Sequence, residues 1–146
     1  MNKEAFFHQL VAFTAAVHEV THDYTKDVIP GDITPVQYGI MEYIAVSQPV
    51  TLSQISDCKH ISMPNTSREL KKLSEKNLCE KFDVEGDRRK QFIRLSAEGQ
   101  AVMDGVFGQL GSRFFERMKD ATEEEQQAIY EAMELLHTKV FYRDPK

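Results

Sequence analysis

The spacing of apolar residues changes near the middle of the chain, and this change restricts the folds open to it. Apolar residues recur at helical spacing over residues 62–76. Phe82 and Val84 then alternate with charged residues, and a second strand-like run follows at 90–95. The two runs flank a turn at Gly86-Asp87, a pattern typical of a β-hairpin. The sequence therefore predicts a helix followed by a hairpin.

The N-terminal part of the chain carries a long apolar stripe. Residues 2–28 fit one long helix, because apolar residues recur there every three or four positions. The stripe is large for the first helix of a small protein, so a partner chain is expected to help cover it. Packing within one chain is the alternative. The stripe consists of Phe6, Leu10, Phe13, Val17, Val20, Tyr24 and Val28.

Polar caps mark the short helices before the hairpin. Thr34 is a favourable N-cap, and Pro35 at the first helical position loses no hydrogen bond. Thr51 opens the next short helix, and Ser62 can cap the helix that follows. Asn77 tolerates the left-handed conformation common after a last helical turn. These residues predict three short helices between the long first helix and the hairpin.

Two further helices are predicted after the hairpin. Ser96 caps the fifth, and Thr122 with Glu125 forms a capping box before the sixth. The resulting fold class is mainly α with a small β-hairpin. We expect a single domain with a winged helix-turn-helix lobe (31–95) and a helical dimerisation lobe (1–30 and 96–146). The sixth helix is expected to bury Ile129, Ala132, Met133, Leu136 and Val140.

Charge is distributed unevenly along the chain. The net charge of −5 argues against a nucleic-acid partner, yet residues 52–95 hold 10 Lys/Arg and 7 Asp/Glu. The remaining residues hold 8 Lys/Arg and 16 Asp/Glu. Screening limits the reach of each charge to about 8–10 Å at physiological salt, so the local excess matters more than the total. A basic middle is expected of a DNA-reading lobe joined to a helical lobe with another task.

The sequence carries no sign of a membrane or secretory segment. No apolar run approaches the roughly 18 residues of a membrane span, and residues 1–5 do not resemble the start of a secretory signal. We therefore expect a cytoplasmic protein. Cys58 and Cys79 form no CxxC pair, which favours buried thiols over redox sensing or metal binding.

The helix at 62–76 has the chemistry of a recognition helix. It is the second of two short helices before the hairpin, the position that enters a major groove about 12 Å wide. Met63, Leu70 and Leu73 fall on one side of it. Asn65 and Thr66 are expected at base edges, and the cations at phosphates. The candidate DNA-binding residues on this helix are Ser62, Pro64, Asn65, Thr66, Arg68, Lys71 and Lys72.

The tip of the hairpin carries three consecutive cations, Arg88, Arg89 and Lys90. Arginine favours narrow minor grooves, where negative potential is concentrated. Asp87 lies beside the cations and can hold one guanidinium extended. The alternative for the whole chain is a helical protein-interaction module that no longer reads DNA. The cations at the tip favour double-stranded DNA as the partner.

Taken together, these motifs resemble the MarR family. Asp87-Arg88-Arg89 followed by residues 95–99 (Leu-Ser-Ala-Glu-Gly) looks like that family's wing signature. Residues 34–38 resemble the entry into its second helix, and residues 67–78 the end of its recognition helix. The likeness spans essentially the whole chain. The family usually has glycine where Asn77 stands, and both residues accept the left-handed conformation.

The resemblance implies a homodimer with intertwined first, fifth and sixth helices on a pseudo-palindromic operator. It implies that Arg89 enters the minor groove and that Asp87 orients it. Many members repress their own operons and release DNA when a small phenolic or other ligand binds, so a ligand-responsive repressor is expected. Peroxide sensing through a cysteine of the first helix is not expected, because no cysteine precedes Cys58. The expected dimerisation residues are Phe6, Leu10, Phe13, Phe114, Ile129, Met133, Leu136 and Val140.

Polar and aromatic residues suggest two further sites. His22, Tyr38, Met41 and Tyr43 are candidates for an effector pocket, with core packing of Tyr38 and Met41 as the alternative. His18 and His22 lie four positions apart, a spacing that lets two imidazoles face one metal. Glu19 and Asp23 lie nearby, but a closed site would need two more ligands and the fifth helix has no histidine. A metal-responsive regulator is therefore only an alternative, and no cofactor is expected. Phosphate loops, nucleophile elbows and HExxH are absent from the sequence, which disfavours an enzyme.

Overall fold

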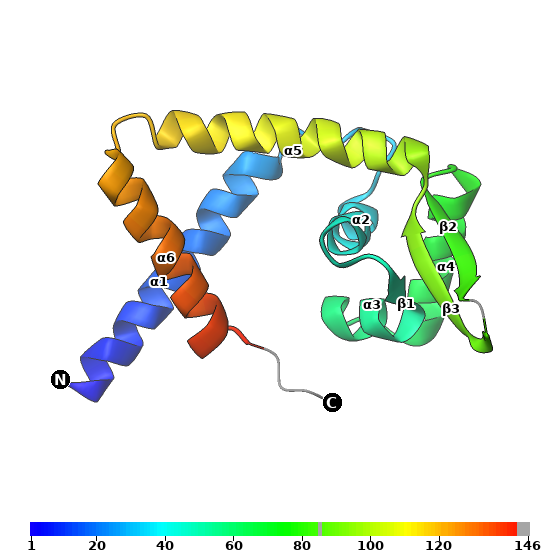
Figure 1. The fold of residues 1–146 in the computed structure, drawn as a ribbon, viewed down its shortest axis with the longest axis horizontal. Helices are drawn as coiled ribbons and strands as arrows, with labels where there is room; N and C mark the ends of the chain where they lie inside the picture. Colours follow the sequence, from blue (N-terminus) through cyan, green and yellow to red (C-terminus); the bar gives the residue numbers. More distant parts are fainter. Residues whose placement is uncertain (85, 143–146) are drawn as a thin grey trace. The chain divides into compact units, whose positions relative to one another are not determined.

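The computed structural model describes residues 1–84 and 86–142, with the side chains of Val84 and of residues 87–90 outside the description. Over these residues the chain forms six helices and three short strands (Figure 1). It divides into two compact units, Met1–Leu110 and Gly111–Lys146. The predicted fold class, mainly α with a small β element, is confirmed. In chain order the elements are α1 (Lys3–Thr25), α2 (Pro35–Ser47), β1 (Val50–Thr51), α3 (Leu52–Lys59), α4 (Met63–Glu75), β2 (Cys79–Val84), β3 (Asp87–Leu95), α5 (Ala97–Arg117) and α6 (Glu123–Lys139).

Side-chain caps set the helix starts where the sequence predicted them. The hydroxyls of Thr34, Thr51 and Thr122 each accept a hydrogen bond from the backbone amide three residues on. In each case the side chain at that third position accepts from the cap amide in return, which completes a capping box. The Ser62 hydroxyl accepts from the Asn65 amide at 3.2 Å and caps α4.

The first helix is shorter than the predicted span of 2–28. It ends at Thr25, and the chain turns so that the Val28 amide donates to the Thr25 carbonyl at 3.2 Å. Val28 is buried among core residues instead of continuing the stripe on α1. Burial of Val28 off the helix explains why helical spacing overestimated the length of α1.

The hairpin is part of a three-stranded antiparallel sheet with the order β1-β3-β2. Val50 pairs with Ile93 and Thr51 with Phe92, so β1 adds a short edge strand that the sequence analysis did not predict. In the hairpin itself Phe82 lies opposite Phe92. Gly86 has a φ of 93°, a conformation that glycine adopts without strain.

The core of the unit Met1–Leu110 gathers residues from α2, α3, α4, the sheet and the first half of α5. Its members alternate along β3 and recur at helical spacing on the helices, as expected for elements that share one core. The apolar side chains that solvent does not reach in the described part of the chain are Ile40, Met41, Ile44, Ile55, Leu73 and Met103.

The start of α5 is fixed to the end of α4 by Ser96 and Gly99. The Ser96 hydroxyl donates to the Asn77 carbonyl at 2.6 Å and accepts from the Gly99 amide at 2.9 Å. A Cβ on Gly99 would lie 2.0 Å from the Leu78 carbonyl oxygen, so only glycine fits. The Ser-x-x-Gly sequence therefore joins the end of α4 to the start of α5.

The helix α6 in the unit Gly111–Lys146 departs from its predicted burial. No residue of α6 is buried, and Leu136 alone among the five expected core residues is half-buried. Ile129 is 38% exposed and Met133 51% exposed. The apolar face predicted from spacing is present, but the single chain leaves it uncovered.

Candidate nucleic-acid interface

Helix α4 has one buried face and one cationic face. Leu70 and Leu73 are buried in the core, and Thr66 is buried between them and the cap. The opposite face is exposed and carries three cations and no buried residue. The residues exposed there include Pro64, Asn65, Arg68, Lys71 and Lys72, together with the cap Ser62.

Two residues of α4 lie differently from the prediction. Thr66 was expected to reach a base edge, but it is fully buried and its hydroxyl donates to the Ser62 carbonyl at 2.8 Å. This bond turns the side chain toward its own helix, so the expectation for Thr66 is wrong. Met63 was expected on the apolar side, yet it is 45% exposed because it lies in the first turn, beyond the core.

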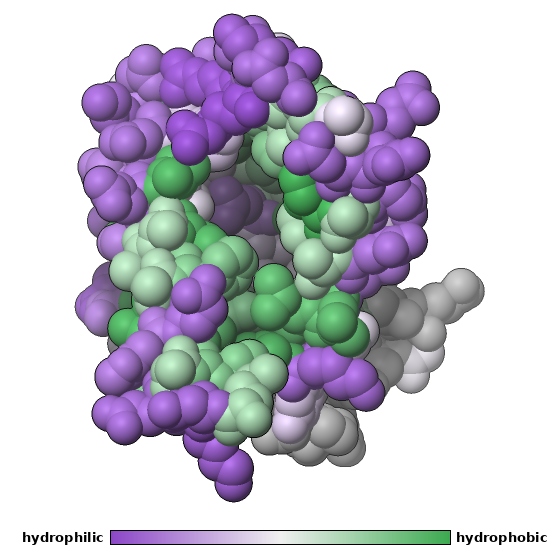
Figure 2. All heavy atoms as spheres, turned by 90° about the vertical axis from the view of Figure 1, so that its left-hand side faces the viewer, coloured by the Kyte–Doolittle hydropathy of each residue, from purple (hydrophilic) through white to green (hydrophobic). Residues whose placement is uncertain are grey.

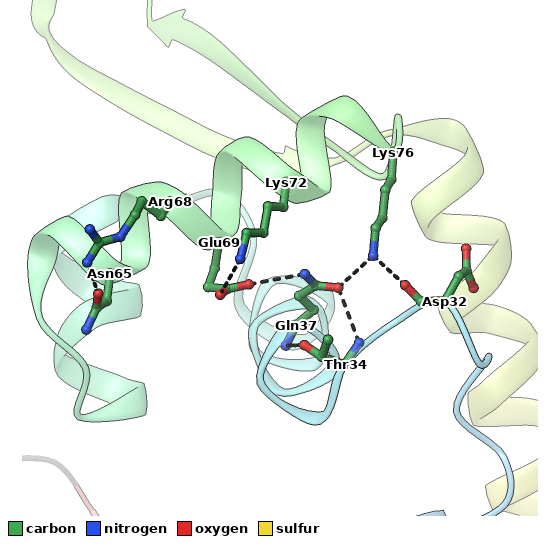
Figure 3. A network of polar contacts seen from close by, with 8 residues as sticks. All are labelled: Asp32, Thr34, Gln37, Asn65, Arg68, Glu69, Lys72 and Lys76. Carbon is green, nitrogen blue, oxygen red and sulfur yellow. Dashed lines mark hydrogen bonds and ion pairs between the residues drawn. The ribbon is translucent and has the colours of Figure 1, made fainter.

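A buried glutamine connects α2 to α4 (Figure 3). The amide nitrogen of Gln37 donates to Glu69 Oε2 at 3.1 Å, and its Oε1 accepts from Lys76 Nζ at 2.9 Å. Lys76 also donates to the carbonyl of Asp32, before α2. Glu69 in turn pairs with Lys72, with 3.4 Å between Nζ and Oε1. Sequence analysis missed this network because its partners lie more than 30 positions apart.

Two side chains of the cationic face contact each other. The Asn65 Oδ1 accepts a hydrogen bond from the Arg68 guanidinium, three positions along α4. Both residues are exposed, so the pair lies at the surface near the helix start. An asparagine and an arginine together offer donors that suit base edges in a major groove.

The turn between α3 and α4 is compact. His60 has a φ of 56°, in the left-handed region. The Ser56 hydroxyl donates to the Ile61 carbonyl, and the Ile61 amide donates to the Ser56 carbonyl at 3.2 Å. These bonds hold α3 and α4 in a helix-turn-helix.

In the hairpin of β2 and β3, which we call the wing, residues 87–90 near the tip are described only in their backbone. Residues 87–90 belong to β3, next to the turn at Gly86. The side chains of Asp87, Arg88, Arg89 and Lys90 lie outside the description. Their predicted roles at DNA therefore stay predictions.

An arginine at the base of the wing was missed by sequence analysis. Arg94 lies over the ring of Phe82, 4.3 Å from its centroid, and its Nε donates to Glu80 Oε1 at 2.8 Å. A cation above an aromatic face is held by the ring quadrupole. The alternation of β3 could have flagged Arg94, because it pairs directly with Glu80 across the hairpin.

The effector-pocket candidates do not form one group. Met41 and Tyr38 are buried in the core, which favours the packing alternative for both. The Tyr38 hydroxyl donates to Glu42 at 2.7 Å. Burial is the main cause that raises the pKa of this hydroxyl, and the Glu42 carboxylate is the second. Tyr43 is half-buried against the core, and His22 is exposed on α1.

The histidine pair and the two free cysteines belong to no metal-binding group in the described part of the chain. His18 and His22 are exposed on α1, and the described residues contain no group of three or more His, Cys, Asp or Glu placed to hold a metal. Cys79 is buried, and burial raises the pKa of its thiol to about 12. Cys58 is half-buried.

Large apolar side chains lie exposed on α1 and on α6. On α1, Phe6 is 65% exposed and Phe13 42%. On α6 the exposed residues include Ile129 and Met133, and Val140 at the C-cap is exposed as well. Figure 2 shows such apolar side chains, in green, bare among charged ones. Among the described residues no helix is both long enough and apolar enough to pass through a membrane.

Known proteins are similar to this chain in the winged helix-turn-helix lobe at residues 31–95, called the winged region below, and in the fold. The model of the MarR family matches residues 31–90. An uncharacterised HTH-type transcriptional regulator of Bacillus cereus is 24% identical over 132 residues, which cover 88% of this chain and 84% of the relative.

Solved structures share the fold of this chain. A MarR family protein from Bacillus stearothermophilus superposes with a TM-score of 0.75 at 16% identity, over 97% of this chain and 99% of the other. Staphylococcus aureus MarR in complex with salicylate and kanamycin gives a TM-score of 0.64 at 21% identity, over 94% and 91%. The family model matches the winged region, and the solved structures show that the chain has the fold of MarR family proteins.

Proposed function

We propose that the protein is a homodimeric transcriptional regulator that binds a palindromic operator in double-stranded DNA, with α4 in the major groove. The observation that carries this proposal is the exposed cationic face of α4 opposite its buried face. A helix of this kind fits a major groove about 12 Å wide. Two-fold symmetry places equivalent helices about one helical turn of DNA apart.

The residues of α4 divide between bases and phosphates. Asn65 and Arg68 lie near the helix start, where they reach base edges. Lys71 and Lys72 neutralise phosphates, and Ser62 with the first backbone amides of α4 binds another. At the wing tip Arg89, with Arg88 and Lys90 beside it, enters the minor groove. In this proposal Asp87 holds Arg89 extended.

A second copy of the chain covers the apolar residues of α1 and α6. Burial of apolar surface contributes roughly 25 cal/mol per Å², so exposed phenylalanines favour association. Phe6, Phe13 and Phe114 are each more than one-third exposed in the single chain. Leu10 and Leu136 are half-buried on the same two helices.

The regulator is a repressor that releases DNA when a small molecule binds. Support comes from the relative in Staphylococcus aureus, whose structure contains salicylate and kanamycin. Tyr43 and His22 are the candidates for contacts with the effector, since Tyr38 and Met41 are core residues. Adding salicylate to a preformed DNA complex tests this: release supports an aromatic acid as effector, and unchanged affinity argues against it.

Titration of the protein with labelled DNA from its own upstream region tests the proposal. We expect the affinity to fall steeply with salt, with a slope of about −0.9 per phosphate for roughly 6–10 contacts. Lys72→Ala and Arg89→Ala weaken binding, whereas Lys119→Ala, an exposed lysine outside the winged region, leaves it unchanged. A dimer without salt-dependent DNA binding would instead support the protein-interaction module.

Metal-responsive regulation is a separate possibility that titration with zinc decides. Because His18 and His22 lie exposed on α1 without further ligands among the described residues, we expect no zinc-dependent change in DNA affinity. A change that His18→Ala with His22→Ala abolishes would contradict this expectation.

A further inference from the structure

We propose that Gln37 is a positioning residue for DNA binding, which holds the carboxylate of Glu69 against α2 and away from the DNA-facing edge of α4. The inference rests on the proposed function. It concerns how a buried residue of another helix controls the charge that α4 presents.

The contacts of Gln37 need both a donor and an acceptor on one side chain. Gln37 is 3% exposed. Its Oε1 accepts from the Thr34 amide at 3.2 Å and from Lys76 Nζ at 2.9 Å, and its Nε2 donates to Glu69 at 3.1 Å. Only an amide side chain offers a carbonyl and an NH2 group together. A carboxylate at this position would repel Glu69, and an apolar side chain would release it.

Glu69 lies on the edge of the proposed DNA-binding face. It follows Asn65 by four positions and precedes Lys72 by three, so all three share one side of α4. Its side chain is 22% exposed, whereas that of Lys72 is 58% exposed. The bond to Gln37 thus holds the carboxylate at the boundary between core and solvent (Figure 3).

Released from Gln37, the carboxylate would turn outward and act on DNA in two ways. It would place a negative charge near the phosphates, and it would pair more fully with Lys72. Both effects reduce the number of phosphates that α4 neutralises. Removing the charge of Glu69 has the opposite effect, because Lys72 is then free for a phosphate. A role limited to packing predicts no such gain.

Three variants separate positioning from stability. The probe is a duplex of about 30 base pairs that the unaltered protein selects from a random pool, long enough for two half-sites. Glu69→Gln keeps an acceptor for Gln37 and raises affinity about two- to fivefold at low salt, with a steeper salt slope. Gln37→Met lowers the melting temperature and weakens binding about three- to tenfold. In the double variant, Gln37→Met with Glu69→Gln, the affinity for the duplex returns to that of Glu69→Gln, while the melting temperature stays low.

The matched control is Glu116→Gln. Glu116 and Lys119 form an ion pair with the same spacing of three positions, 2.9 Å between Oε1 and Nζ, outside the winged region. The affinity of the Glu116→Gln variant for DNA should therefore not change. A double variant as weak as Gln37→Met, or a loss of affinity in Glu69→Gln, would overturn the inference. If Gln37→Met fails to fold, Gln37→Asn, whose amide is one methylene shorter, takes its place with the same expected loss and the same recovery when combined with Glu69→Gln. Failure of the unaltered protein to select any duplex would refute the proposed function itself.

Discussion

The winged region and the terminal helices α1 and α6 differ in how far a single chain buries their apolar side chains. In the winged region Ile40, Ile44 and Ile55 are completely inaccessible to solvent. Neither α1 nor α6 contains a buried residue, although each carries an apolar stripe. The winged region therefore has its own core, whereas the apolar residues of α1 and α6 lie uncovered in the single chain. Burial in a single chain thus distinguishes a region that folds on its own contacts from helices whose apolar faces are left exposed.

The largest effect is expected where the winged region meets α5. Gly99→Ala places a Cβ 2.0 Å from the Leu78 carbonyl oxygen, and two backbone segments must separate to admit it. We expect a loss of about 4 kcal/mol or more in the free energy of unfolding, measured with urea. Gly105→Ala on the same helix is the control: no atom lies within 4 Å of its Cβ, and alanine gains up to about 1 kcal/mol of helix propensity. Equal stability of the two variants would contradict this account of the junction.

The next effect tests the proposal that a second copy of the chain covers α1 and α6. Met133 is 51% exposed, so in an isolated chain Met133→Glu is nearly neutral. Within a dimer interface it buries an unpaired carboxylate on each side, which costs several kcal/mol. We expect the dissociation constant of the dimer to rise at least about 100-fold in sedimentation experiments.

Gln127→Glu adds the same charge at an exposed polar position of α6 and should leave the dimer intact. A Met133→Glu protein that sediments like the unaltered one would show that this face of α6 stays in water. The contrast between the two regions would then fail.

A smaller effect depends on pH in the core of the winged region. Burial raises the pKa of Cys79 to about 12 in the folded protein, against about 8.5 in an unfolded chain. Above pH 8.5 the unfolded chain loses this proton first, so the stability present below that pH falls as the pH rises toward 12. The slope reaches at most about 1.4 kcal/mol per pH unit. Urea unfolding of the unaltered protein should weaken more between pH 8.5 and 9.5 than that of Cys79→Ala; equal losses would argue against a buried thiol.

The smallest effect compares caps in the two regions. Thr51→Ala and Thr122→Ala each remove one capping box, which costs about 1 kcal/mol. Similar losses in thermal unfolding would show that α6 unfolds together with the winged region. No loss for Thr122→Ala would show that α6 is not part of that cooperative unit.

Local signals in the sequence predicted the elements well. The caps Thr34, Thr51, Ser62 and Thr122 start the helices that they were expected to start, because a cap needs only residues within one turn. Asn77 has the predicted left-handed conformation, with a φ of 60°. The two-residue strand β1 was missed because two residues are too few to show a period.

Long-range contacts explain the other differences. Thr66 was assigned to a base edge because threonine can contact a thymine methyl group. Helix periodicity instead places Thr66 toward the core, and its hydroxyl donates to the Ser62 carbonyl of its own helix. Gln37 was read only as part of a helix start, since Glu69 and Lys76 lie 32 and 39 positions away. The end of α1 was predicted too late in the chain, because Val28 continues the helical spacing but is buried in the core.

The mass of the complex between the protein and its selected duplex, measured by sedimentation at low and high salt, tests the central claim most directly. We predict two chains on one duplex at low salt and free dimers at high salt, because phosphate contacts hold the complex together. A complex that contains one chain, or none formed at any salt concentration, would contradict the view that paired cationic helices bind DNA.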